Sequence, residues 1–161
     1  LPFDKLSVIT KMLSGPGINA IKNETPNDDF DLVTLLIGVN NQYQGDSFFV
    51  YEDEFPKLVN TAINKAKGEK DHVVVLSIPD YAYTPFGNGN TNISNAIDKY
   101  NNFAKKYCDS NDIAFLNITD ITRDGLTNTG LVASDSLHPS DLAYSKFVER
   151  LTPIALKILN N

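Results

Sequence analysis

Cysteine and basic residues are scarce in this sequence, and long apolar runs are missing. The single cysteine, Cys108, excludes an internal disulfide framework and a cysteine-based zinc cluster. Fourteen Lys and Arg residues against twenty Asp and Glu residues leave a net charge of −6, which repels phosphate backbones, so we expect no nucleic-acid partner. The longest apolar runs, such as 32–39, fall far short of the ~20 residues that cross a bilayer. We therefore predict a soluble protein without a membrane span.

The first residues carry no targeting signal. Leu1 to Asp4 include no initiator Met, and no charged region leads into the apolar core that a signal peptide needs. We therefore expect a processed or incomplete chain, and the sequence leaves the cellular compartment open.

Strand and helix patterns alternate along the 161 residues, a length that fits one domain. Near-continuous apolar runs, typical of strands buried on both faces, occupy residues 31–37, 72–78 and 113–118. Helical spacing of apolar residues occupies 51–67, 93–107 and 144–159. A further short strand is predicted at 6–10, and Pro56 lies early enough in its helix to be tolerated. This alternation predicts a parallel sheet covered on both faces, a three-layer α/β/α domain over residues 1–161.

Ligands of open parallel sheets bind beyond the carboxyl ends of the strands, here in segments 38–45, 79–90 and 119–140. The last segment contains Asp135 and His138, whose three-residue spacing lets the carboxylate accept the Nδ1 proton of the imidazole. Nε2 would then be free to act as a general base. The other interpretation is an ordinary helix start, with Ser140 as the N-cap and both side chains merely polar loop residues.

Polar residues at the ends of the other strands have two interpretations each. Asn40 follows a buried strand and a glycine, where its amide can face a developing oxyanion or simply close a turn. Asp80 can hold a ligand or cap a turn. His72 lies at the opposite, amino end of its strand, and we interpret it as structural.

Two further groups are weaker candidates. Asp120 and Asp124 with His138 imitate a metal cluster, but their separation and loop context disfavour it, and we predict no metal site. Aromatic residues after the second strand form either an apolar wall for a substrate or anchors that pin their loop to the core; they are Tyr81, Tyr83 and Phe86.

Two of these segments resemble sequence blocks of the SGNH hydrolases, also called GDSL-like lipases and esterases. Gly38-Val-Asn40-Asn41 resembles their Gly-x-Asn-Asp block, and Asp135-Ser-Leu-His138-Pro resembles their closing Asp-x-x-His-Pro block. The segments 78–80 and 84–86 are similar to a bacterial branch of the family. The resemblance runs from about residue 30 to the C-terminus and implies a flavodoxin-like parallel sheet.

The resemblance implies a serine hydrolase that cleaves an acyl or acetyl ester of a small molecule or carbohydrate, without a cofactor. His138 would be the general base, and Asp135 would orient and stabilise its imidazolium form. Asn40 would donate a hydrogen bond in the oxyanion hole, a contact worth ~3 kcal/mol of the barrier. Gly38 would let the backbone turn closely, and Asn41, which replaces the family's usual Asp, would support the loop.

The family's Gly-Asp-Ser block, which carries the nucleophile after the first strand, has no counterpart in this sequence. We therefore expect a domain without its N-terminal strand and helix. A missing central strand leaves unpaired backbone groups that cost about 1 to 3 kcal/mol each when buried, too much for a typical fold. The favoured explanation is a longer protein whose nucleophile lies outside these residues. A second chain that supplies the strand, or a rebuilt site with Ser14 as nucleophile, are the others.

The sequence leaves two competing functions open. One is a catalytically inactive binding module that kept the fold and its crevice but lost the nucleophile. The other is a flavodoxin-like domain that binds a nucleotide or phosphate, which is disfavoured because no Gly-rich phosphate loop follows a strand.

Overall fold

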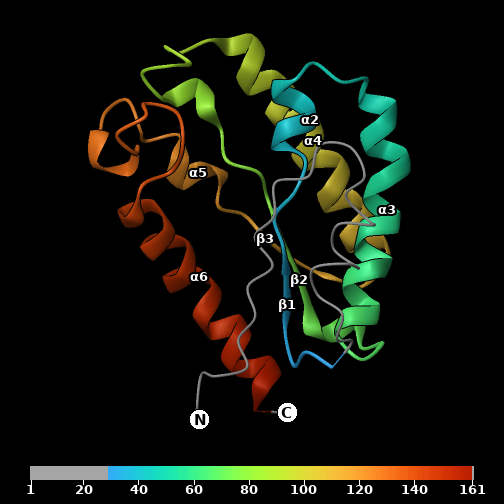
Figure 1. Cartoon of the computed structure of the whole chain (residues 1–161). Coiled ribbons are helices and arrows are strands. Elements are labelled where there is room, and N and C mark those ends of the chain that lie inside the picture. Colours follow the sequence, from blue (N-terminus) through green and yellow to red (C-terminus); the bar gives the residue numbers. More distant parts are fainter. Residues whose placement is uncertain (1–28, 161) are drawn as a thin grey trace.

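The computed structural model describes residues 29–160, which fold around one parallel sheet (Figure 1). Its strands are β1 (Val33–Leu35), β2 (Val73–Leu76) and β3 (Ala114–Leu116), in the order β1-β2-β3. The register pairs Val33 with Val73 and Val74 with Ala114. Each strand lies inside one of the three apolar runs that predicted it.

Helices connect the strands and follow the last one. The α-helices are α2 (Val39–Tyr43), α3 (Phe48–Lys65), α4 (Thr91–Ser110), α5 (Thr119–Thr122) and α6 (Asp141–Leu159). Single 3-10 turns are η2 (Lys70–His72), η3 (Tyr81–Tyr83) and η4 (Thr129–Leu131). In Figure 1, α3 and α4 lie on one face of the sheet and α6 lies on the other.

The period-two alternation of β2 divides the interior into two cores. Val73 and Val75 face the core beneath α3 and α4, whereas Val74 and Leu76 face the core beneath α6. Cys108 is buried in the first core, and burial raises the pKa of its thiol to about 12, so it packs as a small apolar residue. The predicted three-layer α/β/α fold is confirmed.

The described sheet has two edge strands, β1 and β3, and β1 is the one that leads into the turn at Gly38. It pairs with β2 on one side, and within residues 29–160 no strand pairs with its other side. A further strand would extend the sheet on that side. The strand predicted at 6–10 and the candidate nucleophile Ser14 lie outside the described residues.

Two details of the predicted elements are wrong. α3 begins at Phe48, before the predicted start at Tyr51, so Pro56 lies in the helix interior. The spacing of apolar residues does not indicate this first turn, because Phe49 and Val50 are apolar but lie on the exposed side of the helix and so break the amphipathic pattern. The segments after β1 and β3, for which no helix was predicted, contain α2 and α5, which have five and four residues and are too short for a repeating apolar pattern.

The long helices of the described part are amphipathic and carry many polar residues. Between residues 29 and 160, none of them is apolar enough over a sufficient length to span a bilayer.

Candidate active site

A cavity of about 650 Å³ lies where β1 and β2 end. Its described lining is mostly apolar and includes one imidazole and one carboxylate, but no serine, cysteine, lysine or arginine. Parallel strands present their carboxyl ends at one edge of a sheet, which explains why segments far apart in sequence meet here. The lining consists of residues 36–40, 43–44, 79–81, 131–132 and 137–139 with Thr84, Thr122 and Tyr144.

A glycine makes the sharp turn from β1 into α2. Gly38 has a φ of 116° in the left-handed region, and a Cβ there would lie 2.5 Å from Cε2 of Tyr51, so both the backbone angle and the space require glycine. The turn places Asn40 in the first turn of α2, where it is half-buried and lines the cavity. The side-chain amide of Asn40 makes no hydrogen bond with another described residue, so it is available to a bound group.

Asn41 lies beside Asn40 but has a different environment. Its side chain is buried, and its Nδ2 donates to Oδ2 of Asp46 over 3.5 Å, while the Asp46 N–H donates to the Asn41 carbonyl over 2.9 Å. These contacts hold the end of α2 against the following loop.

The turn at 135–138 brings a carboxylate and an imidazole together. Oδ2 of Asp135 lies 2.6 Å from Nδ1 of His138, and Oδ1 accepts the backbone N–H groups of Leu137 and His138, both at 3.0 Å. The left-handed φ of 67° at Ser136 makes this tight turn. An imidazole whose Nδ1 hydrogen bonds to a carboxylate leaves Nε2 free for other chemistry, and His138 lines the cavity.

The same contacts keep Asp135 ionised. The backbone N–H of His138, then that of Leu137, and then the imidazole lower the Asp135 pKa to about 2. The carboxylate is therefore charged at neutral pH, as a group that orients and stabilises an imidazolium must be.

Ser140 is the N-cap of α6, as the alternative interpretation of this segment expected. Its Oγ accepts the N–H of Ala143 over 3.2 Å, so an ordinary helix start and the Asp–His pair coexist. A short antiparallel bridge between Val132 and Pro139 closes the hairpin that carries the pair. The N–H of Ala133 also donates to the His138 carbonyl over 2.8 Å. The hairpin thus fixes the position of the His138 backbone.

Asp80 lines the cavity, but protein groups satisfy its carboxylate. The side chain is fully buried and caps η3 by accepting the Ala82 N–H over 3.0 Å. It also accepts a hydrogen bond from Ser94 and pairs with Nε of Arg123 over 2.9 Å. Arg123 in turn reaches Oδ1 of Asp98 over 2.7 Å. Of the two interpretations, the turn cap describes Asp80, and Arg123 is a partner that no sequence pattern indicated.

The remaining predicted residues separate into those at the cavity and those away from it. Tyr81 lines the cavity, whereas Tyr83 and Phe86 do not. Asp120 instead forms a two-point ion pair with Arg150 on α6. Among residues 29–160 no group of three acidic, histidine or cysteine side chains has the arrangement of a metal site.

Several lining residues were not predicted as part of a site, among them Tyr43, Gln44 and Tyr144. Tyr43 and Gln44 lie in the segment after the first strand, which was already a place to search. Tyr144 was assigned to the inward face of the last helix, because helical spacing does not distinguish a core face from one that ends at a cavity.

The sequence matches a known protein family over most of its length. The model of the GDSL-like lipase/acylhydrolase family matches residues 11–146, which include both the 38–41 segment and the 135–139 segment. No curated protein shows a significant match to the sequence. The family match covers most of the chain and confirms the family that the two sequence blocks predicted. The chain belongs to the GDSL-like lipase/acylhydrolase family.

Proposed function

We propose that this protein is a serine-type hydrolase of carboxylic esters, with His138 as general base, Asp135 as its partner and Asn40 as an oxyanion donor. The observation that carries the proposal is the 2.6 Å contact between Asp135 and His138 on a cavity that Asn40 also lines. Family membership supports the reaction class. Gly38 and Asn41 support the loop that carries Asn40.

The reaction would proceed through an acyl-enzyme. Nε2 of His138 takes the proton from a serine hydroxyl as its oxygen attacks the carbonyl carbon of the ester, and the carbonyl oxygen becomes an oxyanion. The Asn40 amide donates to that oxyanion, and Asp135 stabilises the imidazolium. Collapse of the intermediate breaks the carbon–oxygen bond, and the leaving alcohol takes the proton from Nε2. Water then repeats the sequence and releases the acid.

The nucleophile in this proposal comes from outside residues 29–160, because no serine among them lines the cavity. β1, whose second side has no partner strand among the described residues, ends at Leu35, and residues 36–40 that follow it line the cavity. We infer that a strand added along this side completes the domain and delivers the serine. It can come from a segment of the same protein, from a second chain, or from the region of Ser14.

The substrate of the proposed enzyme is an acyl or acetyl ester of a small molecule or carbohydrate. The absence of lysine and arginine from the described lining supports an uncharged ester, because an anionic group would have no counter-charge there.

Replacing Asn40 with Ala tests the oxyanion role. We expect kcat for a short aryl acetate to fall about 100-fold, because one oxyanion donor typically contributes that much. KM should change little, since the hydrogen bond strengthens as the oxyanion forms. The Asn102→Ala variant on the exposed side of α4 is the matched control and should retain full activity. Equal kcat values for the two variants would remove Asn40 from the mechanism.

A binding module without hydrolase activity is the second candidate. The lack of a nucleophile among the described lining residues favours it. Turnover distinguishes the two candidates, because a module that binds the ester without a serine nucleophile would leave an aryl acetate intact.

A further inference from the structure

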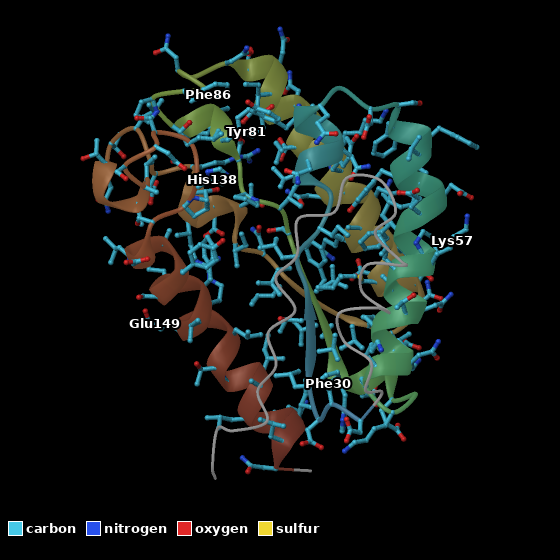
Figure 2. The ribbon with its side chains drawn as sticks, in the orientation of Figure 1. Phe30, Lys57, Tyr81, Phe86, His138 and Glu149 are labelled. Carbon is cyan, nitrogen blue, oxygen red and sulfur yellow. The ribbon has the colours of Figure 1, made fainter. Side chains whose placement is uncertain are left out.

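Three aromatic side chains stand together beside the cavity, and we call Tyr43, Tyr81 and Phe86 the aromatic platform. The ring centroid of Tyr43 lies 5.6 Å from that of Tyr81 and 5.9 Å from that of Phe86, and the centroids of Tyr81 and Phe86 lie 6.3 Å apart. Figure 2 shows Tyr81, Phe86 and His138 at the same end of the molecule, opposite Phe30. Tyr43 and Tyr81 also line the cavity.

The platform leaves much of its aromatic surface uncovered. Tyr43 is 47% exposed and Phe86 is 55% exposed, whereas Tyr81 is buried beneath them. An exposed aromatic cluster at the rim of a cavity is a typical binding surface, because large rings lose favourable burial energy when they are left in water.

The backbone beneath the platform is held tightly. The hydroxyl of Thr84 donates to the Tyr81 carbonyl over 2.8 Å and accepts the N–H of Gly87 over 3.1 Å. A Cβ at Gly87 would lie 2.6 Å from Cα of Ala82, so the turn packs against its own start. Phe86 is therefore presented by a pre-formed turn, which lowers the entropy cost of binding.

A backbone hydrogen bond joins the platform to the turn that carries the proposed base. The N–H of Phe86 donates to the carbonyl of Ser136 over 3.1 Å, and Ser136 lies between Asp135 and His138. A group resting on the platform is thus held in a fixed position relative to the turn that carries the imidazole.

We propose that the aromatic platform is a subsite for an uncharged sugar ring that forms the alcohol portion of the ester. This proposal rests on the proposed hydrolase function and names its substrate class. A sugar ring has an apolar C–H face that packs on aromatic rings and hydroxyl groups at its edge. Gln44 lines the cavity together with Tyr43 and Tyr81, so its amide can serve as a hydrogen-bond partner for such an edge.

The charges around the platform fit this occupant. The described lining contains no lysine or arginine, and Arg123 already neutralises the Asp80 carboxylate. A phosphorylated or carboxylated alcohol would therefore find neither of these side chains among the described lining residues. A simple alkyl alcohol has no hydroxyl group left to form a hydrogen bond with the Gln44 amide once it is esterified.

The test compares two acetate esters that differ only in the alcohol, methyl 6-O-acetyl-glucoside and butyl acetate. In the double variant Tyr43→Ala, Phe86→Ala, the ratio of kcat/KM for the sugar ester to kcat/KM for butyl acetate should fall about tenfold, mainly through KM. The single Phe86→Tyr variant keeps an aromatic ring at this position and leaves Tyr43 intact. It should show most of the wild-type ratio. Phe49→Ala, which removes another exposed phenylalanine on α3, should leave it unchanged. An unchanged ratio in the double variant would overturn the proposal.

A binding experiment separates the subsite from the hydrolase function. Methyl glucoside has no ester, so saturation-transfer NMR on the full chain detects it at the platform whether or not the protein turns over a substrate. We expect transfer to the sugar C–H protons in the wild type and its loss in the double variant. Transfer without turnover would refute the hydrolase but keep the sugar subsite. Absence of transfer in the wild type would refute the subsite itself.

Discussion

Replacing His138 with Gln should lower kcat/KM for a short aryl acetate by about 10⁴-fold. The variant loses general-base catalysis, and with it the activation of the serine nucleophile. Glutamine keeps the length and polarity of the side chain but cannot accept a proton at neutral pH. The serine hydroxyl would then have no base within reach. The rate of aryl alcohol release by the purified variant measures the effect.

The chain offers a matched control for this variant, because it has only one other histidine. His72 ends η2 immediately before β2, so it lies at the amino end of the sheet, away from the cavity. The His72→Gln variant should hydrolyse the ester at the wild-type rate. Similar activity of the His138→Gln and His72→Gln variants would remove the proposed base.

Replacing Arg123 with Met should lower the free energy of unfolding by about 3 kcal/mol, because it strands a buried carboxylate without its cation. Asp80 is fully buried, and Arg123 is the cation paired with it in the described part of the chain. The hydrogen bonds from Ala82 and Ser94 do not replace that charge. Urea denaturation of the wild type and the variant gives the difference.

Arg150→Met is the control for this prediction. Arg150 forms a two-point pair with Asp120, but both side chains are substantially exposed, so its loss should change stability by less than about 1 kcal/mol. Adding Asp80→Asn to the Arg123→Met variant should restore part of the lost stability, since the buried group is then neutral. Equal, small effects of Arg123→Met and Arg150→Met would show that the buried pair contributes no more than an exposed one.

The fold could be predicted because its signals are local and repeat. Residues 73–76 form an apolar, largely β-branched run, and alternate side chains of this run pack in two cores, as a strand between two helical layers requires. The helices α4 and α6 are long enough to show the helical period several times. By contrast, α2 depends on the left-handed backbone of Gly38, and its five residues contain too few turns to leave such a signal.

The candidate site was predictable where its contacts are short in sequence or follow from where parallel strands end. Asp135 and His138 are three residues apart, so a single turn is enough to join them. That Asn40 lines the same cavity follows from the rule that parallel strands end at one edge. The Asp80–Arg123 pair and the Tyr43–Phe86 contact each join positions about forty residues apart. No periodicity or motif links such positions, so only the packed structure brings them together.

Labelling of the natural protein with a fluorophosphonate, followed by peptide mapping, tests the central claim most directly. This reagent reacts with a serine only when a base activates its hydroxyl. The account predicts one labelled serine outside residues 29–160, with labelling slowed about 10³-fold in the His138→Gln variant. Absence of label, or labelling at the same rate in the His138→Gln variant, would contradict it.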